Sequence, residues 1–217
     1  MEENEITRIE ITIEKPWTTT ITFENQQGLR ETRPVALSDI TRTIHRHVSR
    51  TIYLASEVIA TDWAETVAWW RPPQIQAMVL QHAGGAQGIY RLPMPGLLLR
   101  LKLPHTIAVA AVKGSRRPLP SAPVFHAPLP NIDDRSGRVC LGATQLTCQE
   151  EAVLEIDPQQ VWQDFWGSAF NQHAAANRCK TYPKDVRLLL FELQGKSRFP
   201  PGELLATGDH VESWLEL

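Results

Sequence analysis

Cysteine is scarce in this chain, with three residues in 217: Cys140, Cys148 and Cys179. They form no CxxC pair and no even disulfide framework, which favours a reducing compartment. A zinc site combining them with His173 is an open alternative, but the spacings lack the close ligand pairs that structural zinc requires. We therefore expect no disulfide scaffold, no metal and no cofactor.

Blocks of basic residues and long apolar runs are also missing. Lysine and arginine number 22 against 24 acidic residues, and no basic block exceeds the pair Arg116–Arg117. This balance argues against nucleic acid as a partner. The longest aliphatic run, Ile107–Val112, is too short to span a bilayer, and the acidic stretch Met1–Glu5 is unlike a secretory signal. We expect a cytoplasmic protein without a membrane partner.

The hydrophobic fraction of 42% is sufficient for one domain with a sizeable core. Residues 9–13 alternate apolar and polar side chains, the period of a half-buried strand. Residues 18–23 and 29–35 predict two further strands on either side of a turn. We predict an N-terminal β extension over residues 1–34, an added hairpin, followed by one domain over residues 35–217.

The next region predicts a helix and then an antiparallel β-meander. Ser38 is a helix cap, and apolar residues recur at helical spacing from there to Val48. Short apolar or alternating runs separated by proline and glycine predict the meander strands over residues 66–70, 75–80, 96–103, 106–112 and 123–126. The predicted fold class is α+β, with a meander flanked by helices.

Helical patterns follow the meander. Asp157–Pro158 is a good helix start, and Val161, Phe165 and Ala169 then share one face, which predicts a helix to about Asn177. Residues 186–193 repeat the helical spacing, although they could also form a buried strand. A short terminal helix around Trp214 closes the chain.

The turn-rich stretch leading into Cys140 is the most informative part of the sequence. It contains a Pro130–Asn131 step and a glycine turn at Gly137, with arginines on either side of that turn. A cysteine acts as a nucleophile only as thiolate, in polar and partly exposed surroundings. The alternative for Cys140 is a small buried cysteine acting as a hydrophobe.

Several segments resemble the ubiquitin-conjugating enzymes. In that family a strand leads into His-Pro-Asn, then a glycine turn, then Ile-Cys-Leu, and here Pro130–Asn131 leads through Gly137 to Val139-Cys140-Leu141. The following segments resemble the bacterial branch of the family, which includes PRTRC system protein B and BilB: Trp70–Pro73, Leu92–Leu97, Ala127–Asn131 and Val139–Gly142. The resemblance covers about residues 35–175 and implies a ubiquitin-conjugating-enzyme-like fold.

The resemblance implies roles for four residues. Cys140 would be the transthiolation nucleophile, and Pro130 and Gly137 would shape its loop. Asn131 would either donate to the oxyanion as a catalytic residue or hold the loop as a turn-forming asparagine. The chain departs from the eukaryotic pattern, because Leu129 replaces the histidine and Asn131 lies nine rather than eight positions before Cys140.

The implied activity is that of a transferase in ubiquitin-like conjugation. A ubiquitin-like protein would pass from an activating enzyme to Cys140 as a thioester and then to an amine on a target. The bacterial branch implies an antiviral defence operon, with a JAB-type metalloprotease as a possible further partner. Two alternatives remain open: a cysteine-dependent hydrolase using His126 or His173 as base, and a non-catalytic module of the same fold.

Overall fold

The computed structural model describes residues 6–14, 18–25, 27–36, 39, 58–62, 65–103, 106–147 and 156–215. The helix predicted from Ser38 to Val48 lies outside these ranges, apart from Asp39, and Cys148 lies outside them too. The described chain consists mostly of antiparallel sheets with three α-helices, which confirms the α+β class. None of these helices has both the length and the apolar character to cross a membrane.

The N-terminal segment forms a sheet of its own. Its strands are β1 (Ile6–Glu14), β2 (Thr18–Asn25) and β3 (Arg30–Pro34), paired antiparallel in that order. They confirm the three strands predicted from alternation and the intervening turn. The division of the chain at residue 34 stays a prediction.

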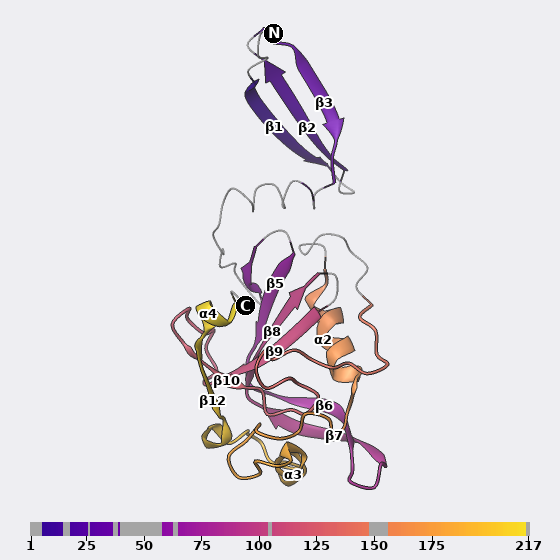
Figure 1. Ribbon diagram of the computed structural model, residues 1–217, viewed down its shortest axis with the longest axis vertical. Helices are drawn as coiled ribbons and strands as arrows, with labels where there is room; N and C mark the ends of the chain where they lie inside the picture. The colour runs from indigo at the N-terminus through magenta and orange to yellow at the C-terminus, as the bar shows by residue number, and fades with distance from the viewer. Residues whose placement is uncertain are drawn as a thin grey trace.

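A six-stranded sheet forms the centre of the molecule (Figure 1). Its spatial order is β12-β10-β9-β8-β5-β4. The strands are β4 (Val58–Thr61), β5 (Thr66–Arg71), β8 (Gly96–Lys102), β9 (Thr106–Val112), β10 (Pro123–His126) and β12 (Ala206–His210). The last strand was not predicted, because Ala-Thr-Gly-Asp-His has neither β-branched enrichment nor apolar alternation.

The predicted simple meander is wrong in one respect, because a long hairpin bends out of the central sheet. β6 (Gln74–Gln81) pairs with β7 (Gln87–Met94), while β5 and β8 pair with each other. Pro72, Pro73 and Pro95 lie at the two bends. Proline lacks the N–H that a continuous ladder needs, so both strands change sheet there. Figure 1 shows β6 and β7 turned away from the direction of β5 and β8.

The α-helices of the described residues pack against the central sheet or the β6–β7 sheet: α2 (Pro158–Gly167), α3 (Val186–Glu192) and α4 (Val211–Leu215). A 3₁₀ turn, η2 (Pro201–Glu203), precedes β12. Asp157 caps α2 by accepting from the Gln159 N–H, as its sequence predicted.

The prediction that this helix runs to Asn177 is wrong, because α2 ends at Gly167. The hydroxyl of Ser168 donates to the Phe165 carbonyl at 2.7 Å and closes the last turn. The next two residues form β11 (Ala169–Phe170), which pairs in parallel with β6. The apolar spacing through Ala169 therefore continues into a strand, where tertiary pairing overrides the local period.

The main hydrophobic core joins the central sheet and the sheet of β6, β7 and β11 with α2 and α3. Leu97, Leu99 and Leu101 of β8 point into it, and Trp162 and Phe165 of α2 are fully buried there. Leu98 of the same strand belongs to a second cluster on the opposite face, together with α4. Because β8 is buried on both faces, its sequence is a nearly continuous apolar run.

Candidate active site

Cys140 lies at the end of a short hairpin. Ile132 and Val139 form an antiparallel bridge, and Asp133 N–H donates to the Arg138 carbonyl at 2.8 Å. The N–H of Cys140 donates to the Asn131 carbonyl at 2.7 Å. The cysteine main chain is therefore held by the residue that begins the hairpin.

The turn of this hairpin is built around the Asp133 carboxylate. It accepts from the Ser136 hydroxyl at 2.6 Å, from the Ser136 N–H at 2.8 Å and from the Arg135 N–H at 3.2 Å. The Ser136 hydroxyl is the main reason that the pKa of Asp133 lies below its ordinary value. Gly137 follows with φ of +69°, a conformation that glycine adopts readily.

The hairpin extends the central sheet by pairing with β9. Val109 N–H donates to the Gly137 carbonyl at 2.8 Å, and Val139 N–H donates to the Ile107 carbonyl at 2.9 Å. A Cβ at Gly137 would lie 3.1 Å from the Val109 carbonyl oxygen. Close approach to β9 is thus a second reason for glycine at this position.

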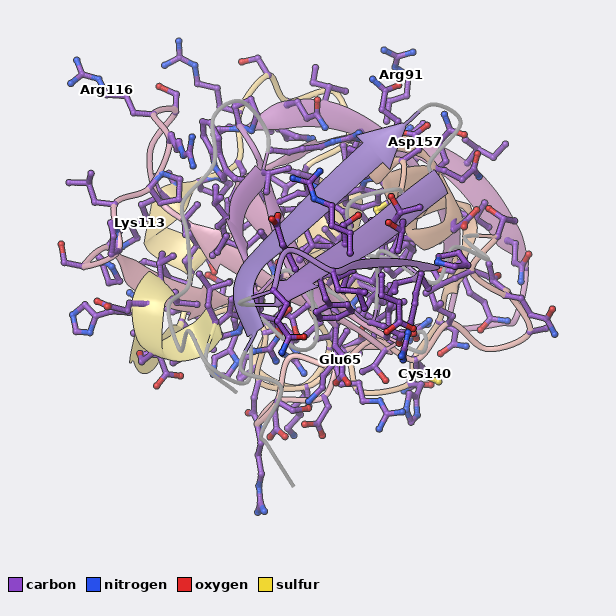
Figure 2. The ribbon with its side chains drawn as sticks, turned by 90° about the horizontal axis from the view of Figure 1, so that it is seen from above. Glu65, Arg91, Lys113, Arg116, Cys140 and Asp157 are labelled. Carbon is purple, nitrogen blue, oxygen red and sulfur yellow. The ribbon has the colours of Figure 1, made fainter. Side chains whose placement is uncertain are left out.

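The Cys140 side chain is exposed, while its two neighbours are anchored. Val139 and Leu141 are half-buried and pack against the main core. Figure 2 shows Cys140 at the margin of the molecule. The structure thus contradicts the alternative that Cys140 is a buried hydrophobe, because its thiol is accessible from solvent.

The chain after Cys140 is tied to α2 through Asp164. Its carboxylate accepts from the Thr147 N–H at 2.8 Å and from the Thr147 hydroxyl at 2.9 Å. The amide of Gln160 donates to the other carboxylate oxygen at 2.9 Å. Cys140 is consequently fixed by main-chain bonds before it and by α2 after it.

Asn131 is buried, and both polar atoms of its side chain are hydrogen-bonded. Its Nδ2 donates to the Ala169 carbonyl at 2.8 Å, and its Oδ1 accepts from the Asn171 N–H at 3.3 Å. Its own N–H donates to the His173 carbonyl at 2.7 Å. With φ of +61°, it holds a left-handed conformation that asparagine tolerates better than most residues. Asn131 therefore joins the Cys140 hairpin to the segment after α2.

The approach to Asn131 is a buried, tightly turned segment. The Leu129 N–H donates to the Ala127 carbonyl at 2.8 Å, and both side chains are fully buried. Pro130 is buried as well. The position that carries histidine in the eukaryotic pattern is thus a core leucine here, with no polar group to offer.

Arg178 lies beneath the hairpin and was not anticipated from the sequence. Arg178 is 1% exposed, and its guanidinium donates to the Ile132 carbonyl. Burial lowers the pKa of Arg178 against the opposing effect of Asp134 and Asp133. Burial, followed by the charge of Arg178, also lowers the pKa of His126 on β10. No local pattern marks this arginine, because its partner is 46 residues away in the chain.

The other candidate groups do not join Cys140. Among the described residues, neither His126 nor His173 forms a hydrogen bond with the Cys140 thiol. The same residues contain no group of three histidine, cysteine or acidic side chains that could hold a metal ion. Cys179 is fully buried, and burial raises the pKa of its thiol. Of the two described cysteines, only Cys140 is accessible.

These features define an α+β protein that presents an accessible cysteine, Cys140, on a hairpin anchored by a buried asparagine. A family model, prokaryotic E2 family D, matches residues 36–207. The chain belongs to this family, E2 being the usual abbreviation for a ubiquitin-conjugating enzyme. The expected membership of a bacterial ubiquitin-conjugating-enzyme-like family is confirmed. Comparisons with curated proteins and with solved structures find no match.

Proposed function

We propose that this protein is a conjugating enzyme that carries a ubiquitin-like protein as a thioester on Cys140. The observation that carries the proposal is the exposed thiol of Cys140 at the end of an anchored hairpin, in a chain of the prokaryotic E2 family D. The ubiquitin-conjugating-enzyme-like fold is part of the same proposal. It is supported by the order of sheet, Pro130–Asn131 step, cysteine and helix.

The proposed reaction has two acyl transfers. The Cys140 thiolate attacks the thioester carbonyl carbon that joins the ubiquitin-like protein to the activating enzyme, a new C–S bond forms, and the activating enzyme leaves as thiolate. An amine on the target then attacks the same carbonyl carbon. The C–N bond forms, the C–S bond to Cys140 breaks, and the proton lost by the amine balances the thiolate that departs.

Exposure of Cys140 suits both transfers, because each requires a second protein at the sulfur. The thiol projects from a short hairpin, and Val139 and Leu141 beside it anchor the main chain in the core. A fixed main chain limits the conformations of the nucleophile before partners arrive. Pro130 and Gly137 contribute to this shape.

We assign Asn131 to the shape of the loop in preference to the oxyanion. Its Nδ2 already donates to the Ala169 carbonyl, its Oδ1 already accepts, and its side chain is buried. An oxyanion donor must point to the place where charge develops. The contacts of Asn131 run instead to the segment after α2.

The partners follow from the reaction. They are an activating enzyme, a ubiquitin-like protein and a target amine, with a JAB-type metalloprotease from the same antiviral defence operon as a further partner. We place this chemistry in the cytoplasm, where exposed thiols such as Cys140 stay reduced.

Two alternative functions are less well supported. A hydrolase would need a base, and no described imidazole hydrogen-bonds to Cys140. A non-catalytic module would leave the exposed thiol without a role.

The test is a thioester assay with the activating enzyme, ATP and the ubiquitin-like protein, with gels run with and without reductant. Wild type should form a reductant-labile adduct, Cys140→Ser a reductant-stable adduct or none, and Cys140→Ala none. Cys179→Ala, which removes the buried thiol, is the matched control and should keep the labile adduct. A labile adduct that persists on Cys140→Ala would refute the assignment.

A further inference from the structure

A cavity of about 590 Å³ opens where the bent hairpin meets the turn after β9 and the segment before β12. This size is typical of ligand pockets. The cavity is lined by Pro73, Gln74, Pro93, Met94, Pro95, Gly96, Val112, Lys113, Gly114, Ser115, Ser197, Arg198, Phe199, Pro201 and Leu204. No acidic side chain is among them, so its charged groups are all cations.

The cavity is separate from the Cys140 site. The Cys140 hairpin meets β9 at Ile107 and Val109, whereas the cavity begins at Val112 and extends past the end of that strand. Figure 2 shows Lys113 on one side of the molecule and Cys140 on the other. The reaction proposed for Cys140 therefore leaves this cavity unused.

The apolar part of the cavity is preformed. Met94, Val112 and Leu204 are almost completely buried, and Phe199 is 7% exposed. Prolines from both bends and from η2 contribute further rigid walls. A bound aliphatic side chain would meet surfaces that need little reorganisation.

Two cations from different segments border this apolar surface. Lys113 Nζ lies 4.5 Å from the centre of the Phe125 ring, a cation–π contact that restrains the ammonium group. Arg198 lies on the segment before η2. Neither side chain forms an ion pair with a carboxylate of the described ranges. The nearby Glu203 is already engaged, because it accepts from the Thr181 hydroxyl at 2.7 Å.

The turn after β9 also offers main-chain donors. In the described part of the chain, no hydrogen bond uses the N–H groups of Gly114 and Ser115. Gly114 has φ of +90°, and a Cβ there would meet no atom within 4 Å, so another main chain can approach closely. A peptide, with carbonyl oxygens at regular intervals, matches these donors better than a compact organic acid.

We propose that this cavity docks an acidic segment of a partner protein in extended conformation. Its carboxylates would contact Lys113 and Arg198, and an aliphatic side chain between them would pack on the exposed rings of Pro73 and Pro201. The proposal does not depend on the chemistry of Cys140. It gives the protein a second, non-covalent contact on the side away from the thiol.

The test is fluorescence polarisation with a labelled, capped peptide of sequence Glu-Leu-Glu-Leu, compared with Gln-Leu-Gln-Leu. Wild type and Cys140→Ala should bind the acidic peptide equally and the neutral peptide about tenfold more weakly, because charged hydrogen bonds are lost. Lys113→Gln combined with Arg198→Gln should raise the Kd by tenfold or more. Arg91→Gln, an exposed cation outside the lining, is the matched control and should leave the Kd unchanged.

Ser115→Glu tests the same site without removing the contact between Lys113 and Phe125. It places an acid on the lining and should weaken binding of the acidic peptide, whereas Ser115→Gln should not. Equal binding of both peptides, or equal binding by Ser115→Glu and Ser115→Gln, would overturn the proposal. If free glutarate displaces the peptide at equal molar concentration, the cavity is a small-acid site and the peptide assignment is wrong. The thioester assay is independent, so failure here leaves the Cys140 proposal intact.

Discussion

Replacing Asn131 by alanine is the sharpest test of how this protein positions its cysteine. The substitution removes both side-chain hydrogen bonds, to the Ala169 carbonyl and from the Asn171 N–H. Asn131 is only 4% exposed, and its partners Ala169 and Asn171 are half-buried, so both bonds are partly shielded from water. It also places alanine at φ of +61°.

The expected cost follows from these contacts. A fully buried polar group left without its partner costs about 1–3 kcal/mol, and because both of these bonds are only part-buried, we take about 2–4 kcal/mol for the two groups together. A left-handed conformation at a residue with a Cβ adds about 1 kcal/mol. The free energy of unfolding should therefore fall by about 3–5 kcal/mol, a large share of the stability of an ordinary domain.

Asn131→Gly separates the two contributions. Glycine adopts the positive φ readily but makes neither hydrogen bond, so it should be about 1 kcal/mol more stable than Asn131→Ala. Urea denaturation followed by tryptophan fluorescence measures both variants. In parallel, single-turnover discharge of the Cys140 thioester to free lysine measures the effect on chemistry under conditions in which both variants are folded.

Two results would refute the reasoning. If Asn131→Ala unfolds within about 0.5 kcal/mol of wild type, the buried bonds do not hold the loop. If stability is kept while discharge falls by about 10²–10³ and thioester formation is unchanged, Asn131 is an oxyanion donor after all. A loop-shaping role predicts instead that stability falls and that formation and discharge weaken together.

Two further predictions concern the hairpin and β10. Gly137→Ala should lower the free energy of unfolding by about 2 kcal/mol or more and reduce thioester formation, because its Cβ would lie 3.1 Å from the Val109 carbonyl oxygen at a residue of positive φ. The control Gly142→Ala, at φ of +62° with no atom within 4 Å of its Cβ, should show only the cost of the positive φ. Equal losses of stability in the two variants would contradict the proposed contact with Val109. Burial and then the charge of Arg178 lower the pKa of His126 in the folded protein, so the unfolded chain binds more protons than the folded one as the pH falls. The free energy of unfolding should therefore decrease as the pH drops below about 6.5, the pKa of an unfolded histidine, towards the lower pKa of the folded state. His126→Gln should flatten this part of the pH profile in urea denaturation at about pH 7.5 and about pH 5, and an unchanged slope would show that His126 is not responsible.

Local patterns predicted much of the secondary structure. Alternation identified β1 and β2, and a proline at the first turn after Asp157 identified the start of α2. The ambiguous segment 186–193 is helical, with α3 spanning Val186–Glu192. These predictions succeed because the period of apolar residues and the caps depend on neighbours a few positions away.

Long-range pairing produced the errors. β6 was predicted as part of one meander and β7 was not predicted, yet the prolines at the two bends place both strands in another sheet, where β11 joins them. α2 was extended through Ala169 because its spacing continues, whereas Val79 of β6 supplies a strand partner there. Propensity and period contain no information about such partners.

Local sequence patterns were sufficient to predict an α+β protein with a turn-rich stretch around Pro130, Asn131, Gly137 and Cys140. They did so because turn residues and apolar periods act locally. The folded structure was needed to show that Cys140 is exposed while Cys179 is buried, and that the Asn131 side chain bonds to the segment after α2. It alone placed Arg178 beneath the hairpin. Burial and hydrogen-bond partners depend on segments tens of residues apart, and folding brings those segments together.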